Sequence, residues 1–137
     1  LCIDGDGPGV VFEPWGPLLE LPGRLASSDA ILGIFGATDK ARRVIPNKVY
    51  QGLAIGRPVI TASTSAYPES LRANEDQGLF WALPGDTASI QAAVNRLQAR
   101  RTMLLTLGQA ALTSYQAHFS NQVIAAGLNR ILSLIEH

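Results

Sequence analysis

The chain has 137 residues, of which 47% are hydrophobic and 16% charged, and its formal net charge is zero. This length suits one domain over residues 1–137 with a single core, and the composition is too apolar for a disordered chain. Because eleven Lys and Arg balance eleven Asp and Glu, no broad basic field is available for a nucleic acid. We therefore expect no nucleic-acid partner, and we expect any anionic ligand to be small and bound locally.

One cysteine, Cys2, and two histidines exclude an internal disulfide and a structural zinc site. No run approaches the roughly 18 consecutive apolar residues of a transmembrane helix, and the N-terminus does not resemble a signal peptide. These features favour a cytoplasmic protein without a transmembrane segment. The sequence begins at Leu1 rather than at methionine, so we expect a piece of a longer chain.

Short apolar runs separated by Gly and Pro indicate strands that alternate with helices. The runs Leu1–Asp4 and Val10–Pro14 predict strands, and three- and four-residue apolar spacing over Leu18–Ser28 predicts a short helix. The uncharged run Ala30–Phe35 is typical of a strand covered on both faces, as in a parallel sheet.

A polar loop with three basic residues follows Gly36 and leads into the best-marked helix of the sequence. Pro46 suits the first helical position and Gly56 the residue just past the end, so residues 46–55 are predicted to be helical. Two further strands are predicted, at Pro58–Thr61 and Gly78–Leu83. Four further helices are predicted: a short one at Tyr67–Asn74, one that begins after a cap at Asp86 or Thr87, one at Arg101–His118, and one at Asn121–Glu136 after a Ser120 cap.

This alternation predicts an α/β fold with a doubly wound, mostly parallel sheet covered on both faces. In such sheets ligands bind beyond the carboxyl ends of the strands. The loops to search are therefore Asp4–Pro8, Gly36–Lys48 and Thr61–Pro68.

The start of the 46–55 helix is the main candidate for an anion site. Its first N–H groups have no intrahelical partner, and the helix dipole adds positive potential there. Lys48 lies in the first turn and Arg42 and Arg43 precede it, which is what a phosphate or diphosphate needs. The same charges also fit an ordinary solvated surface. Gln51 shares a face with Asn47 and could bind hydroxyl groups, or simply be an exposed helix former.

Two other features could contact a ligand. The turn Gly5–Pro8 lets the backbone approach a ligand closely, although a plain turn explains it more simply and the full dinucleotide fingerprint is absent. Trp15 lies in a stiff loop between prolines, where its ring could stack on a nucleobase or cover the edge of the core. His118 and Cys2 fit structural roles, and no catalytic triad or metal cluster stands out.

Three segments of the sequence together resemble a known family: ILGIFG, RVIPNKVYQGLAIGRPVITA and GLFWALPGDTASIQAAVNRL. They are similar to the C-terminal, nucleotide-sugar-binding domain of GT-B glycosyltransferases, nearest to bacterial enzymes of the retaining family 4 type. The resemblance covers nearly the whole chain. It implies a Rossmann-like domain, incomplete at its N-terminus, from a hexosyltransferase of polysaccharide biosynthesis. The acceptor domain would be missing, and it could attach the enzyme to the inner membrane.

The resemblance also implies roles for single residues. Lys48 and Arg43 become the expected catalytic residues, and Gln51 replaces the glutamate that usually binds the ribose, which predicts weaker ribose binding. Many family members carry a glutamate at the position of Arg43. The implied donor-binding set, for a nucleoside-diphosphate sugar without a metal cofactor, is Gly5, Gly7, Trp15, Gly16, Ile45, Pro46, Asn47, Lys48 and Gln51.

Two alternatives remain open. A sugar-nucleotide epimerase would share this fold but needs carboxylates near the sugar ring, and Glu69 and Glu75 are the only nearby candidates. A non-catalytic binding domain would fit Gln51 and the zero net charge. An incomplete sheet would also expose apolar surface, which favours a homo-oligomer.

Overall fold

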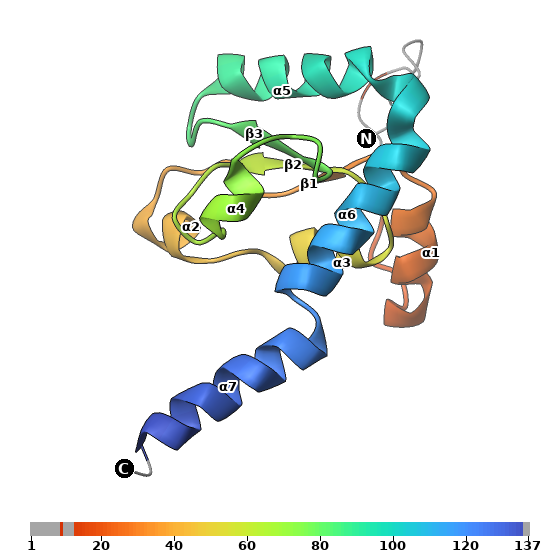
Figure 1. Cartoon of the computed structure of the whole chain (residues 1–137). Coiled ribbons are helices and arrows are strands. Elements are labelled where there is room, and N and C mark those ends of the chain that lie inside the picture. Colours follow the sequence, from red (N-terminus) through yellow and green to blue (C-terminus); the bar gives the residue numbers. More distant parts are fainter. Residues whose placement is uncertain (1–8, 10–12, 136–137) are drawn as a thin grey trace.

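The computed structural model describes Gly9 and residues 13–135, which form an α/β fold around a parallel sheet (Figure 1). The sheet has the order β1-β2-β3, with β1 at Ile31–Leu32, β2 at Val59–Ala62 and β3 at Leu79–Ala82. All three lie within or overlap the strands predicted from the sequence. Hydrogen bonding continues past β1, because Gly33 donates to the Ile60 carbonyl at 2.8 Å and Ala62 donates to the Ile34 carbonyl at 3.0 Å.

Helices make up most of the remaining described chain, and they fall where the sequence predicts them, with one addition. Their bounds are η1 Leu18–Glu20, α1 Leu21–Ala26, α2 Asp39–Arg43, α3 Asn47–Ala54, α4 Glu69–Arg72, α5 Thr87–Ala99, η2 Arg101–Met103, α6 Leu104–His118 and α7 Asn121–Ile135.

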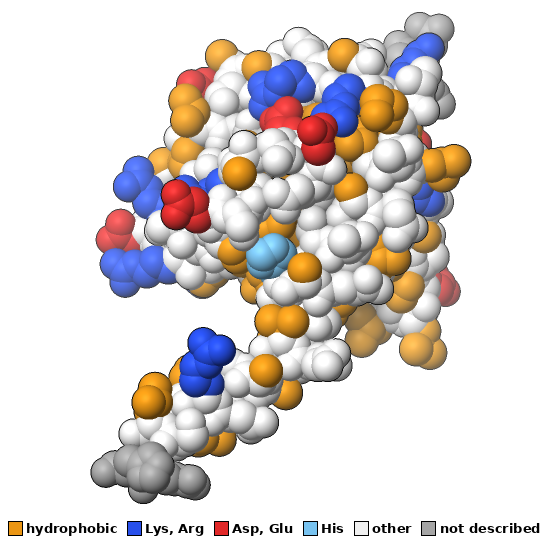
Figure 2. All heavy atoms as spheres, viewed as in Figure 1, with side chains coloured by type: hydrophobic (Ala, Val, Ile, Leu, Met, Phe, Trp, Pro, Cys, Tyr) orange, Lys and Arg blue, Asp and Glu red, His pale blue; other side chains and the backbone are white. Residues whose placement is uncertain are grey.

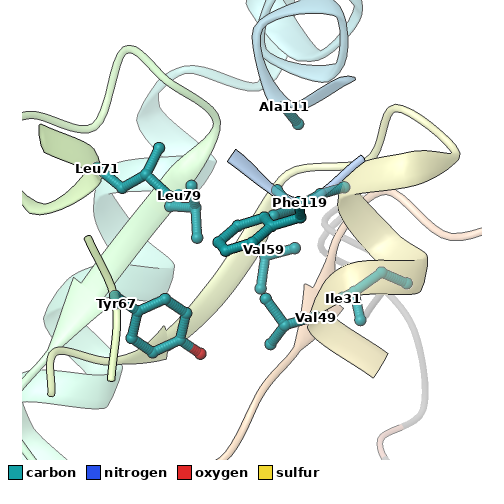
Figure 3. Packing of buried hydrophobic residues seen from close by; sticks show 9 residues of the cluster. Ile31, Val49, Val59, Tyr67, Leu71, Leu79, Ala111 and Phe119 are labelled. Carbon is teal, nitrogen blue, oxygen red and sulfur yellow. The ribbon is translucent and has the colours of Figure 1, made fainter. Parts of the chain in front are cut away.

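Helices cover both faces of the sheet (Figure 1). Successive strand residues point to opposite faces. Val59 and Leu79 therefore pack with α3 and α4 on one face (Figure 3), while Ile60 and Phe80 pack with α5 on the other. Helix α6 packs against α3 and contributes to both clusters. These observations establish an α/β architecture with three described parallel strands.

The ends of α3 and α5 show how local sequence sets helix bounds. Pro46 has an extended conformation (φ −70°, ψ 149°), so it precedes α3 as the N-cap rather than occupying the first helical position. Gly56 follows α3 with φ +71°, as predicted. Asp86, and not Thr87, caps α5, because its Oδ1 accepts a hydrogen bond from the Ser89 N–H at 3.0 Å.

Helix α2 was not predicted, since its polar sequence has no apolar period. The Thr38 side chain caps it by accepting a hydrogen bond from the Ala41 N–H at 3.2 Å, and Asp39 complements the helix dipole. The predicted strand Leu1–Asp4 lies outside the described residues. Most of Val10–Pro14 does as well, and the two described residues there, Glu13 and Pro14, are not in a strand.

Helix α7 leads away from the sheet after the turn at Phe119 and Ser120 (Figure 1). It begins where predicted, with Ser120 Oγ accepting from the Val123 N–H at 3.3 Å, and none of its residues is buried. In Figure 2 it carries hydrophobic side chains exposed along its length. Within the part of the chain that the structure describes, every helix is too short or too polar to cross a bilayer.

Candidate functional site

The loops at the carboxyl edge of the sheet meet across the end of β2. Ser63 donates to the Ala82 carbonyl at 2.8 Å, and Gly85 donates to the Phe35 carbonyl at 2.7 Å. The segment after β1 thus reaches the segment after β3, although the two strands are not neighbours in the sheet. In open parallel sheets, ligands bind beyond this carboxyl edge.

Helix α3 starts at this edge. It connects the parallel strands β1 and β2, so it runs opposite to them and its N-terminus lies beside their carboxyl ends. The Val49 N–H donates to the Pro46 carbonyl at 2.9 Å. Within residues 13–135, the amides of Asn47 and Lys48 donate no hydrogen bond, and both side chains are exposed. The first turn of α3 therefore offers two backbone donors and one ammonium group to an anion.

Helix α2, which the sequence did not predict, adds positively charged side chains to the segment between β1 and α3. Lys40, Arg42 and Arg43 are all exposed. The guanidinium of Arg43 lies 3.6 Å from the Asp39 carboxylate on the same helix, and this pair is 77% and 86% exposed. Such exposed pairs are weak, so Arg43 can exchange Asp39 for another anion at little cost.

The remaining predicted residues of this region differ in accessibility. Gln51 is half-buried on α3, one turn after Asn47. Ile45 is partly buried against the core cluster that also holds Val49, so its side chain has a packing role. Tyr50, which the sequence did not single out, packs edge-to-face on Phe119 with 5.1 Å between ring centroids. Burial raises the pKa of Tyr50.

Trp15 and Gly16 lie elsewhere on the described surface. They line a hollow of about 240 Å³ that also includes residues of η1 and α1, and the Trp15 side chain is fully exposed. Arg24 at this hollow pairs with Glu13 at 2.8 Å and Glu20 at 3.3 Å. The lining contains neither Lys48 nor Gln51, and α1 and α2 lie on opposite sides of the view in Figure 1. Gly5 and Gly7 lie outside the described residues.

Two polar pairings that the sequence did not predict lie in or beside the sheet. The Tyr67 hydroxyl and Thr61 Oγ1 lie 3.1 Å apart in the core, and burial raises the pKa of Tyr67. Glu75 binds Arg96 through both carboxylate oxygens, at 2.8 to 3.1 Å. The hydrogen bonds with Glu75 raise the pKa of Arg96. A threonine within the apolar run of β2 was the only sequence signal for the first pair.

A second hollow of about 400 Å³ lies between the residues preceding β3 and helix α6, with Gln77, Gln109 and His118 among its lining. Its polar lining includes Ser114, whose hydroxyl donates to the Gln77 carbonyl at 2.9 Å. No residue of α3 belongs to it. Among the described residues, no three His, Cys, Asp or Glu side chains gather in a way that could hold a metal ion.

No family model matches this chain, and no curated protein or solved structure is significantly similar to it. A function for the chain must therefore be argued from its own residues and from the resemblance of its sequence motifs.

Proposed function

We propose that this chain is the donor-binding, Rossmann-like domain of a GT-B glycosyltransferase of the retaining family 4 type. Its ligand would be a nucleoside-diphosphate sugar whose diphosphate binds at the N-terminus of α3. The observation that supports this most directly is the exposed first turn of α3, where Asn47 and Lys48 lie at the carboxyl edge of a parallel sheet.

The chemistry of glycosyl transfer fits these groups. When the bond between the sugar and the diphosphate breaks, negative charge develops on the leaving phosphate oxygen. Backbone amides and an ammonium group fixed near that oxygen stabilise the charge without rearranging. Lys48, together with the amides of Asn47 and Lys48, would carry this role. Arg43 would assist after leaving Asp39.

Gln51 would bind the ribose hydroxyls one turn farther along α3. A neutral amide forms hydrogen bonds worth about 0.5–1.5 kcal/mol, whereas bonds to a charged carboxylate are worth about 1.5–3 kcal/mol. We expect ribose to contribute less to affinity here than in family members with glutamate. The diphosphate would then dominate recognition.

The epimerase alternative is weaker because of the state of Glu75. Its carboxylate accepts hydrogen bonds from Arg96 and from the Trp81 N–H, the latter at 3.1 Å. These bonds give it a structural role, so it is not a free acid or base for a sugar ring. Glu69 is exposed in the first turn of α4. Donor binding without turnover would instead favour a non-catalytic domain.

Ligand-induced thermal stabilisation tests the proposal. UDP, GDP, dTDP, ADP and inorganic phosphate are compared on the chain, on Lys48→Ala, and on Arg130→Ala as a charge-matched control on α7. A ligand at 100 times its Kd stabilises the folded state by about 2.7 kcal/mol, which gives a clear rise in Tm. We expect one diphosphate to raise Tm in the parent chain and in Arg130→Ala but not in Lys48→Ala. An equal rise in Lys48→Ala, or no rise with any diphosphate, would contradict the proposal.

A further inference from the structure

The turn between β3 and α5 holds the segment that leads into α2. The Gly85 N–H donates to the Phe35 carbonyl at 2.7 Å, and this bond crosses the end of β2, which lies between β1 and β3 in the sheet. The approach is also close, because a Cβ atom on Gly85 would lie 3.2 Å from the Cβ of Ala37. With φ at +75°, Gly85 adopts a backbone conformation that favours glycine. The turn therefore contacts the chain on both sides of Gly36.

The turn itself is fixed to the body of the domain. The Leu83 N–H donates to Ser89 Oγ at 2.8 Å, and the Ser89 N–H donates to Asp86 Oδ1 at 3.0 Å. The Asp86 N–H donates in turn to the Leu83 carbonyl at 3.3 Å. Helix α5, which begins here, packs on β3. Because strand, turn and helix are joined in this way, the turn offers a hydrogen-bond donor at a fixed position.

Helix α2 depends on its two ends for its position. All its residues are exposed except Ala41, which is half-buried. Before the helix, Phe35 packs on the core cluster that lies under α5, and after it Ile45 packs on the cluster that lies under α3. Residues 36–44 are therefore anchored at Phe35 and at Ile45, and the bond from Gly85 is part of the first anchor.

We propose that Gly85 is a positioning residue for the diphosphate site, an inference that rests on the function proposed above. Gly85 would not touch the ligand. Its bond to Phe35 sets where α2 begins, and only three residues separate Arg43 at the end of α2 from Asn47 at the start of α3. The cations of α2 would thus be held near the first turn of α3. Side chains held in this way lose less freedom when a diphosphate binds, so their bonds to it add more affinity.

The variant Gly85→Ala tests this role, with Gly56→Ala as the matched control. The two glycines have similar φ values, +75° and +71°. A Cβ atom on Gly56 would lie 3.3 Å from the Gly108 carbonyl oxygen, close to the 3.2 Å contact at Gly85. Gly56 lies between the end of α3 and the start of β2, at the opposite edge of the sheet from the site. Both variants should lower Tm by comparable amounts, so a difference in binding between them reports on position and not on stability.

Two measurements are made on the parent chain and on both variants. Isothermal titration calorimetry with UDP, GDP, dTDP and ADP gives the Kd of the diphosphate that binds. Hydrogen exchange without ligand follows residues 36–45, with the amides of Ala41 and Arg42, both bonded to Thr38, as reporters. We expect Gly85→Ala to weaken binding about fivefold or more, through loss of charge-assisted hydrogen bonds, and to speed exchange in this segment. Gly56→Ala should change neither quantity.

The outcomes separate this role from the proposed function. An unchanged Kd in Gly85→Ala, or equal weakening in both variants, would overturn the positioning role and leave the donor site supported by binding to the parent chain. Parent-like exchange over residues 36–45 in Gly85→Ala would overturn it whether or not a ligand binds. A parent chain that binds no diphosphate would overturn the proposed function and the positioning role together.

A milder variant serves if Gly85→Ala does not fold. Ser89→Ala removes the acceptor of the Leu83 N–H and loosens the turn without changing Gly85. We expect the same direction of change, with weaker binding and faster exchange over residues 36–45. Parent-like values of both quantities in Ser89→Ala would then overturn the proposal.

Discussion

Gly33 leaves open the space that the side chain of Thr61 fills. A Cβ atom on Gly33 would lie 2.5 Å from the Thr61 Cβ and closer still to its Oγ1. Gly33 is buried at the end of β1, and Thr61 is fully buried in β2. The glycine in the ILGIF run therefore allows a polar pair, Thr61 and Tyr67, to lie inside the core.

Substitution of Gly33 by alanine should destabilise the fold. The added methyl group overlaps Thr61, and overpacking of this kind costs about 1–3 kcal/mol. The free energy of unfolding from urea denaturation measures the effect. Gly23→Ala is the matched control, because a Cβ there has nothing within 4 Å and α1 favours alanine over glycine. We expect the control to be neutral or stabilising by about 0.4–1 kcal/mol, and a loss as large as that of Gly33→Ala would refute the steric explanation.

Substitution of Gly56 by alanine should also destabilise, through backbone conformation and because the added Cβ would lie 3.3 Å from the Gly108 carbonyl oxygen. The Gly56 N–H donates to the Leu53 carbonyl at 3.1 Å and the Arg57 N–H to the Gly52 carbonyl at 2.9 Å, a Schellman ending for α3. With φ at +71°, alanine at this position costs about 1–2 kcal/mol. Urea denaturation measures the loss. Gly56→Asn should recover part of it, since asparagine tolerates this conformation better than alanine; equal losses for the two variants would contradict the backbone explanation.

The buried Tyr67 predicts how stability responds to alkaline pH. Burial raises the pKa of Tyr67 above its usual value of about 10, with the Thr61 hydrogen bond offsetting part of the shift. Between the unfolded and folded pKa values, the unfolded chain has lost a proton that the folded chain keeps. The free energy of unfolding should therefore be highest below about pH 10 and fall as pH rises through this window.

The variant Tyr67→Phe separates the effect of Tyr67 ionisation on stability from the effects of other groups that titrate at alkaline pH. Losing the hydrogen bond with Thr61 should lower stability at neutral pH by about 0.5–1.5 kcal/mol. Above pH 10 the variant should lose stability less steeply than the parent chain, since phenylalanine cannot ionise. Urea denaturation across this pH range gives both slopes, and identical slopes would show that Tyr67 does not titrate as the structure implies.

Local signals in the sequence were sufficient to predict an α/β fold with a parallel sheet, and they predicted where α3 begins. The apolar runs predicted β1, β2 and β3, and the Pro46 to Gly56 interval predicted α3 to within one residue. Chain order then placed Asn47 and Lys48 at the carboxyl edge, because a helix between parallel strands must begin there. The missed helix α2 has only a Thr38 cap as its signal, since four charged residues and one alanine give no apolar periodicity.

Tertiary contacts account for what the sequence did not reveal. Nothing near Trp15 in the sequence indicates that its ring lines a hollow with residues of η1 and α1. Likewise, Glu75 and Arg96 are 21 residues apart, so their pairing depends on how α5 lies on β3. The Ser120 cap marked the start of α7, but the sequence did not indicate that none of its residues would be buried, which depends on packing in three dimensions.

The link between Glu75 and Arg96 yields a prediction that distinguishes two kinds of ion pair. Arg96 binds both oxygens of Glu75 and also donates to the Trp81 carbonyl at 2.7 Å, while Glu75 accepts from the Trp81 N–H. Removal of the carboxylate leaves the Trp81 N–H without its partner. Glu75→Ala should therefore lower the free energy of unfolding by about 1–3 kcal/mol, measured by urea denaturation.

The neighbouring pair of Asp76 and Arg100 is the matched comparison for Glu75. Its atoms are 2.8 Å apart, but the Asp76 side chain is 77% exposed and Glu75 only 22%. An exposed pair contributes about 0–1 kcal/mol, so Asp76→Ala should have a small effect that disappears at high salt. The effect of Glu75→Ala should persist in high salt, because the lost hydrogen bond to the backbone is only weakly screened. Similar losses for the two variants under both conditions would mean that the bond to Trp81 adds nothing to the ion pair.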